Sequence, residues 1–279
     1  MTVHTRQAGL FSAPVVALHS SASSSIQWKH LAGELDGRFI LTAPDLPGYG
    51  VANDVTRDSV KGVATAAGMV IEHIAEFGQP IHLVGHSNGA AVAIKVALMR
   101  PDLVKSLTIY EPASFQFLKS GNETDQAFHE EILAVSDAVA KGLDAGQDDQ
   151  GMEGFIDFWN GPGCWEAMPE YSQTKLAALA PSIVSDFACG FAETWTLDDL
   201  RTLSMPTLVL MGLESPEIAQ HVAAEVAAAI PQARLAMLPG LGHMAPVFEP
   251  EWVDPRICEH IVGVERPMAN CYWPERSAA

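Results

Sequence analysis

The chain contains a serine at the centre of a G-x-S-x-G pattern, and this pattern restricts the fold more than any other segment. Four mostly apolar residues (81–84) precede it, and small and apolar residues follow it at helix-like spacing. This succession predicts a buried strand, a sharp turn and a helix. Such a turn strains the backbone of its central residue, Ser87, and needs small neighbours such as Gly85 and Gly89 so that the strand and the helix can pack. We therefore expect the Ser87 hydroxyl to be held above the edge of a sheet.

The segments around this turn predict an alternation of strands and helices. A bare G-x-S-x-G is common, but one placed between a strand and a helix resembles the nucleophile elbow of the α/β-hydrolase superfamily. The resemblance implies an α/β-hydrolase fold, in which helices flank a mostly parallel sheet. From apolar runs and apolar periodicity, we expect strands at 14–18, 39–43, 81–84, 104–110, 206–212 and 234–238, and helices at 28–35, 59–77, 219–230 and 250–262.

A helix-rich segment interrupts this alternation at residues 113–203. In the superfamily such an insertion is a lid. We therefore divide the chain into an α/β-hydrolase core, residues 1–112 and 204–279, and a helical lid, residues 113–203. Only thirteen residues precede the first predicted strand, where the superfamily usually has two strands, so we expect a sheet that is shorter by one strand.

The predicted lid is rich in tryptophan and phenylalanine. Most aromatic residues of a packed insertion belong to its own core, because the insertion has to bury an apolar face. Residues 158–165, however, combine turn residues with two indoles. We therefore expect Trp159 and Trp165 to line the substrate pocket.

The polar segment after the first predicted strand is suited to acyl transfer. Acyl transfer passes through a tetrahedral intermediate whose oxyanion needs preorganised N–H donors. In the superfamily this loop carries a His-Gly-x motif, and here it begins His19-Ser20-Ser21, with Ser20 where glycine is usual. The resemblance implies that the backbone N–H groups of Ser21 and of Asn88, the residue after the nucleophile, form the oxyanion hole. The alternative is an ordinary serine-rich loop.

A serine nucleophile also needs an acid and a base, which should follow it in the order serine, acid, histidine. His243 lies in a glycine-containing loop after the last predicted strand, where the superfamily keeps its general base. The usual acid position after the penultimate strand holds Ser215, with Glu214 one residue early. Glu111 directly follows an earlier strand, at the edge where sites of open α/β sheets lie. We favour Glu111 as the acid over Glu214, and the alternative for each is a solvated surface carboxylate.

Composition restricts the partners and the location of the protein. Acidic residues outnumber basic ones by 34 to 16, and the net charge of −18 disfavours binding to nucleic acid or to anionic membranes. No apolar window approaches the roughly 20 residues of a membrane span, and no secretory signal pattern follows Met1, so we expect a cytoplasmic protein. The cysteines form no C-x-x-C and no metal-ligand pairing with histidine, so we expect neither a disulfide framework nor a metal site; they are Cys164, Cys189, Cys258 and Cys271.

These features predict a serine hydrolase that cleaves a carboxylic ester of a small to medium, partly apolar substrate through an acyl-enzyme. No cofactor or metal is required, the expected partner is the small-molecule substrate, and a homodimer is an open alternative to a monomer. Serine at the elbow argues against dehalogenases and epoxide hydrolases, which use a carboxylate nucleophile. A lactonase, an amidase, a C–C bond hydrolase or a haloperoxidase-like enzyme could use the same residues. The alternative from a different class is a non-catalytic ligand-binding protein that keeps the fold.

Overall fold

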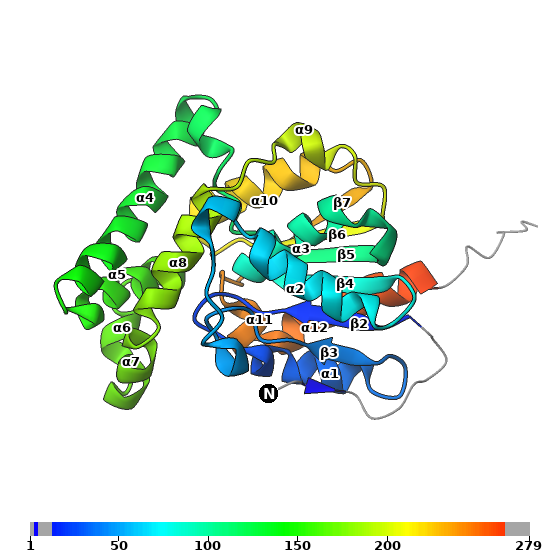
Figure 1. Cartoon of the computed structure of the whole chain (residues 1–279), viewed down its shortest axis with the longest axis horizontal. Helices are drawn as coiled ribbons and strands as arrows, with labels where there is room; N and C mark the ends of the chain where they lie inside the picture. Colours follow the sequence, from blue (N-terminus) through cyan, green and yellow to red (C-terminus); the bar gives the residue numbers. More distant parts are fainter. Residues whose placement is uncertain (1–2, 5–12, 266–279) are drawn as a thin grey trace, which may run out of the picture.

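A computed structural model describes residues 3–4 and 13–265 of the chain. Its centre is a seven-stranded sheet with the order β1-β3-β2-β4-β5-β6-β7 (Figure 1). The strands are β1 (Val3–His4), β2 (Val15–Leu18), β3 (Leu41–Ala43), β4 (Ile81–His86), β5 (Val104–Tyr110), β6 (Thr207–Gly212) and β7 (Ala233–Leu238). Strands β2 to β7 run parallel, and β1 pairs antiparallel with β3. The predicted mostly parallel α/β architecture is confirmed.

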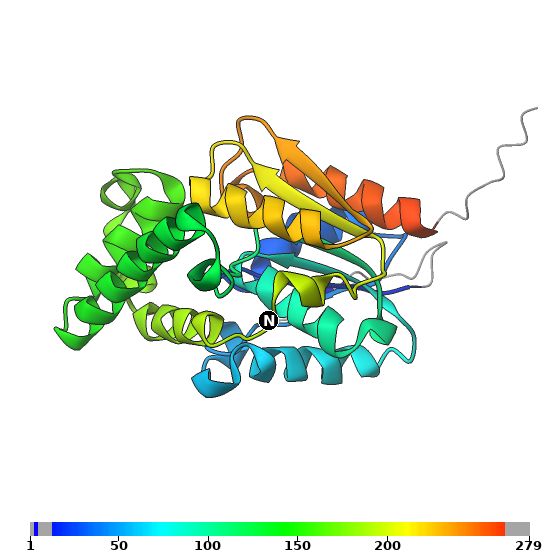
Figure 2. The ribbon, with the colours of Figure 1, turned by 90° about the horizontal axis from the view of Figure 1, so that it is seen from above.

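Helices cover both faces of this sheet. They are α1 (Lys29–Leu35), α2 (Ala64–Ala75), α3 (Asn88–Met99), α10 (Glu217–Ala229), α11 (Ala245–Phe248) and α12 (Pro250–Glu265). Val16 and Leu18 of β2 pack in one hydrophobic cluster with α2, α3 and α10, whereas Val15 and Ala17 pack in a second cluster with α1 and α12. Figure 2 shows α2 and α12 on opposite sides of the strands. Because both faces of the sheet are buried, the sequences of the strands are nearly continuous apolar runs.

The chain between β5 and β6 is helical, as the sequence predicts. We call residues 113–203 the helical insertion. Its helices are α4 (Glu123–Asp144), α5 (Asp148–Asn160), α6 (Cys164–Ala167), α7 (Glu170–Ala177), α8 (Ala180–Phe191) and α9 (Leu197–Leu200). Figure 1 shows helices α4 to α8 in green to one side of the sheet, with α9 next to α10. The longest, α4, begins at a capping box in which the Asn122 and Asp125 side chains each accept the other's backbone N–H. Local signals in the sequence thus set the start of this helix.

The turn after β4 holds Ser87 in the conformation expected of an elbow. Ser87 has φ 53° and ψ −117°, which few residues with a side chain adopt. A Cβ on Gly89 would lie 2.4 Å from the carbonyl oxygens of Leu18 and His19, and a Cβ on Gly85 would lie 2.6 Å from the carbonyl oxygen of Gly89. Only glycine fits at such distances, so these two positions allow α3 to pack directly against the strands.

Replacing Gly89 by alanine should destabilise the fold, because the added methyl group meets backbone atoms rather than a flexible side chain. We expect a loss of about 1–3 kcal/mol in the free energy of unfolding, as is typical of overpacking. Gly68→Ala in α2 is the matched control: its Cβ meets nothing within 4 Å, and alanine favours a helix by up to about 1 kcal/mol. Urea denaturation of both variants measures the difference, and equal stabilities would show that the turn tolerates a side chain.

Candidate active site

Three side chains from distant parts of the chain form a continuous hydrogen-bonded series. The Oγ of Ser87 lies 3.0 Å from Nε2 of His243, which is in the loop after β7. The other ring nitrogen of His243, Nδ1, lies 2.6 Å from Oε2 of Glu111, which follows β5. An ionised carboxylate can only accept, so Nδ1 carries the proton and Nε2 accepts from the Ser87 hydroxyl. Such an arrangement can take the proton from a serine while the carboxylate orients the imidazole.

The Glu111 carboxylate is buried and accepts hydrogen bonds on both oxygens. Oε1 accepts from the Gly212 N–H at 2.6 Å and from Ser215 Oγ at 2.7 Å, while Oε2 accepts from His243. The backbone of Glu111 has φ 42°, in the left-handed region that residues with side chains seldom adopt. This conformation directs the carboxylate from the end of β5 toward the ends of β6 and β7.

The structure separates the two candidate acids. Glu214 is exposed on an outer cleft, and within the described residues its side chain forms no hydrogen bond to His243. Its backbone N–H donates to the Leu241 carbonyl and so connects the two loops. Ser215, which occupies the usual acid position, lies close enough to donate its hydroxyl to Glu111. This contact of Ser215 was not predicted, although a serine at that position together with a glutamate after β5 was a signal for it.

Two buried side chains hold the loop that carries His243. The Tyr110 hydroxyl donates to the Gly242 carbonyl at 2.7 Å, and His86 donates from Nε2 to the His243 carbonyl at 2.8 Å. Burial, with the nearby His243, lowers the pKa of His86 well below its ordinary value, so its ring is neutral and Nδ1 can accept. Gln27 donates to this Nδ1 at 3.1 Å. His86 therefore connects the His243 loop with the loop after β2.

Gln27 also holds the loop after β2, where serine replaces the usual glycine. Its Oε1 accepts from both the N–H and the hydroxyl of Ser20, at 3.1 and 3.2 Å. His19 donates from Nδ1 to the Ser20 carbonyl at 2.7 Å and accepts on Nε2 from the Leu46 N–H at 2.9 Å. Burial lowers the pKa of His19 to about 4, which keeps the ring neutral as this pairing requires. The Ser20 hydroxyl thus has a buried partner and fits the loop.

The two residues expected to supply oxyanion donors lie beside Ser87. Ser21 and Asn88 both line the cavity that contains Ser87. Asn88 is the first residue of α3, where backbone N–H groups have no acceptor within the helix. Within the described residues the Ser21 N–H donates no hydrogen bond, whereas its hydroxyl donates to Asp186. Among residues 3–4 and 13–265, neither N–H group has a protein acceptor, and both lie next to the serine.

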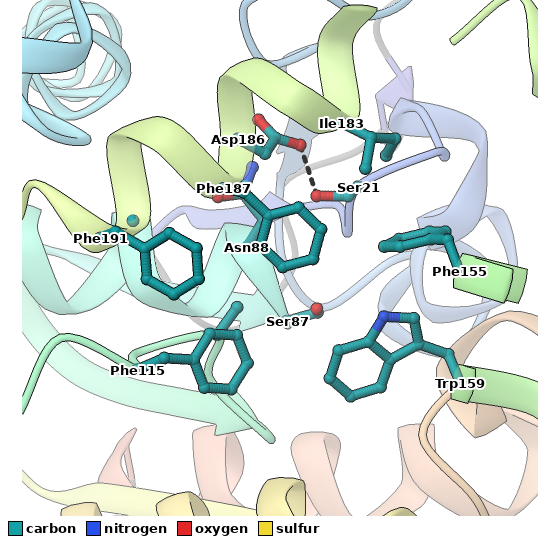
Figure 3. Close-up of a pocket in the computed structure, with 12 residues that line it drawn as sticks. Ser21, Ser87, Asn88, Phe115, Phe155, Trp159, Ile183, Asp186, Phe187 and Phe191 are labelled. Carbon is teal, nitrogen blue, oxygen red and sulfur yellow. Dashed lines mark hydrogen bonds between the residues drawn. The ribbon is translucent and has the colours of Figure 1, made fainter. Parts of the chain in front are cut away.

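A cavity lies over Ser87, and much of its wall is aromatic (Figure 3). Trp159, one of the two expected pocket residues, lies on this wall, and its ring centroid is 4.2 Å from that of His243. Trp165 lies elsewhere: its side chain packs in the hydrophobic core, and its backbone N–H donates to Asp157. The lining residues are Ser21, Ser87, Asn88, Ala113, Phe115, Phe155, Trp159, Ile183, Asp186, Phe187, Gly190 and Phe191.

Most of the aromatic wall comes from two helices of the insertion. Ile183, Phe187 and Phe191 recur every four residues on one face of α8, and Phe155 precedes Trp159 by the same spacing on α5. The individual residues other than Trp159 were not predicted to line the pocket. Their spacing indicated an apolar helix face, but an apolar face can meet either a core or a cavity.

Three further features of the described residues concern metal sites, membrane-spanning helices and paired cysteines. No group of three or more His, Cys, Asp or Glu side chains there is arranged to hold a metal ion. No helix within those residues has both the length and the apolar character needed to cross a bilayer. Cys164, Cys189 and Cys258 are free thiols, and Cys271 lies outside the described residues.

Sequence comparison places this chain among known hydrolases. A family model described as "Alpha/beta hydrolase family" matches residues 15–256. A pimeloyl-(acyl-carrier protein) methyl ester esterase of Edwardsiella ictaluri is 26% identical over 257 residues, which cover 89% of this chain and 93% of that protein. The enzyme of the same name from Methylococcus capsulatus is 37% identical over 95 residues, 34% of this chain and 35% of that protein. The chain thus matches about a third of the length of this second relative.

Comparison with solved structures leads to the same fold. MenH from S. aureus superposes with a TM-score of 0.73 at 18% identity, and the match covers 95% of this chain and 98% of that one. At this level of identity the likeness concerns the fold alone. Because the family model covers most of the chain, and because its relatives are named hydrolases and esterases, the chain belongs to the alpha/beta hydrolase family of enzymes.

Proposed function

We propose that this enzyme hydrolyses a carboxylic ester of a small to medium, partly apolar substrate through an acyl-enzyme on Ser87. The observation that carries the proposal is the hydrogen-bonded series from Ser87 through His243 to Glu111, with distances of 3.0 and 2.6 Å. The Edwardsiella ictaluri relative, whose name states a methyl ester as its substrate, supports an ester as the bond that is cleaved.

In the proposed reaction, His243 Nε2 takes the proton of Ser87 as Oγ attacks the carbonyl carbon of the ester. The carbonyl oxygen becomes an oxyanion and accepts from the N–H groups of Ser21 and Asn88. The intermediate then collapses, the C–O bond to the alcohol breaks, and His243 returns the proton to the departing oxygen. Water, deprotonated by His243, hydrolyses the acyl-enzyme in the same way. Glu111 holds Nδ1–H throughout and stabilises the imidazolium that forms.

The cavity over Ser87 favours an apolar acyl group. Phenylalanine rings form much of its wall, and an apolar lining of this kind is typical of small-molecule pockets. Trp159 also lines a second, outer cleft, and His243 lines that cleft too. In our proposal the alcohol leaves through this outer cleft, because His243 has to protonate its oxygen.

The helical insertion acts as a lid in this proposal. It contributes α5 and α8 to the wall of the cavity, and Ser87 is only 7% exposed beneath them. Excluding water in this way strengthens the electrostatic interactions that stabilise an oxyanion. A non-catalytic ligand-binding protein has less support, because the complete hydrogen-bonded series is in place.

A fluorophosphonate tests for an activated serine without knowledge of the substrate. We expect intact-mass spectrometry to show one phosphonyl adduct on the wild-type protein and none on Ser87→Ala, because the adduct forms on Oγ. Hydrolysis of a short-chain aryl ester should fall by at least about 10⁴-fold in the same variant. A folded wild-type protein that forms no adduct and cleaves no ester would instead support the ligand-binding alternative.

The two candidate acids can be distinguished by matched substitutions. Glu111→Gln should lower kcat by roughly 10³- to 10⁴-fold, because a neutral amide cannot hold the tautomer or stabilise the imidazolium. Glu214→Gln should stay within about two-fold of wild type, since that side chain is exposed and does not meet His243. Ser215→Ala, which removes one donor to Glu111, should fall between them. A larger loss in Glu214→Gln than in Glu111→Gln would reverse the assignment.

A further inference from the structure

A buried ionic cluster joins the helical insertion to the loop that carries Ser21. Asp186, on α8, is 8% exposed, and its Oδ2 accepts from the hydroxyls of Ser21 and Tyr49. Its Oδ1 pairs with the guanidinium of Arg57. Figure 3 shows the bond between Asp186 and Ser21 on the wall of the cavity that holds Ser87.

The partners of Asp186 all come from the core, so the cluster is a connection between the two parts of the chain. Burial raises the pKa of the Asp186 carboxyl, and Arg57 and the two hydroxyls oppose this by favouring its charged form. Arg57 also donates to the Ser182 carbonyl at 2.9 Å, and the Ser182 hydroxyl donates to the Gly48 carbonyl at 2.8 Å. These groups satisfy one another, which is the condition for keeping a charge buried.

The loop that receives this contact has a backbone conformation that needs support. Ala22, directly after Ser21, has φ 55°, in the left-handed region that alanine seldom adopts. Such a conformation persists only where surrounding contacts hold it. Gln27 holds the loop at Ser20 from within the core, and Asp186 holds it at Ser21 from the insertion.

We propose that Asp186 is a positioning residue for the oxyanion hole: through the Ser21 hydroxyl it fixes the direction of the Ser21 N–H. This inference rests on the proposed function, in which that N–H stabilises the oxyanion. It gives the insertion a second role besides covering the cavity, because a side chain of α8 sets the geometry of a donor in the core. Displacing a donor matters most in the transition state, where the negative charge develops.

Two variants that each remove one hydroxyl from Asp186 test this proposal. Ser21→Ala and Tyr49→Phe both take a donor from the same oxygen, Oδ2, but only Ser21 carries the N–H in question. Loss of a whole oxyanion donor costs about 10²- to 10³-fold, so a donor that is present but misaligned should cost about ten-fold. We therefore expect Ser21→Ala to lower kcat on an aryl ester about ten-fold with KM nearly unchanged, and Tyr49→Phe to keep kcat within about two-fold.

A third variant distinguishes positioning of the Ser21 N–H from anchoring of the helical insertion to the core. Glu193, which follows α8, accepts from the Val63 N–H at 2.8 Å and from Lys95 at 2.9 Å, away from the Ser21 loop. Glu193→Gln should lower the melting temperature but leave kcat close to wild type. Asp186→Asn should reproduce the loss of Ser21→Ala, and the double variant should be no slower than the slower single variant.

The outcomes distinguish this proposal from the proposed function. If wild type cleaves esters and reacts with the fluorophosphonate, but Ser21→Ala and Tyr49→Phe have equal kcat, the positioning role of Asp186 is wrong and the ester hydrolase remains. If Ser21→Ala instead lowers the melting temperature and leaves kcat close to wild type, as we expect of Glu193→Gln, the cluster only anchors the insertion. If wild type shows neither reaction, both proposals fail. Should Asp186→Asn not fold, the pair Ser21→Ala and Tyr49→Phe still decides.

Discussion

The rest of the site depends on the hydrogen bonds that the buried carboxylate of Glu111 accepts. A carboxylate is stable in such a place only when donors replace water, and here they come from Gly212, Ser215 and His243. Gly212 ends β6, Ser215 lies in the loop after β6, and His243 lies in the loop after β7. The carboxylate therefore holds the ends of neighbouring parallel segments together, and His243 faces Ser87 because it is held in this way.

The core and the insertion make different contributions to the site. The parallel strands bring Ser87, Glu111 and His243 to the same edge of the sheet, so the core supplies the three groups to which we assign the reaction. The insertion supplies the apolar wall through α5 and α8, together with the carboxylate of Asp186. Charge interactions are stronger where water has little access, so the environment of the buried Ser87 depends on how the insertion packs over the strands.

The elements that could be predicted from the sequence are those with local causes. The strand at 104–110 has the predicted bounds, and the elbow at Ser87 follows from its glycines and from the apolar residues before it. The pocket was harder to predict, because Trp159 and Trp165 lie six residues apart in one segment and only Trp159 reaches the cavity. Packing between helices determines the direction in which each indole points, and the local sequence pattern does not predict that direction.

The sequence by itself determined the fold class, the serine, the histidine and a short list of acids, because strands, tight turns and loop positions follow from residues close together in the chain. Tertiary structure decided which carboxylate meets His243 and which side chain holds Ser21. Glu111 lies 132 positions from His243, and Asp186 lies 165 positions from Ser21. Contacts over such separations depend on the register of the sheet and on the packing of α8 against the core, which the local pattern of apolar and polar residues does not specify.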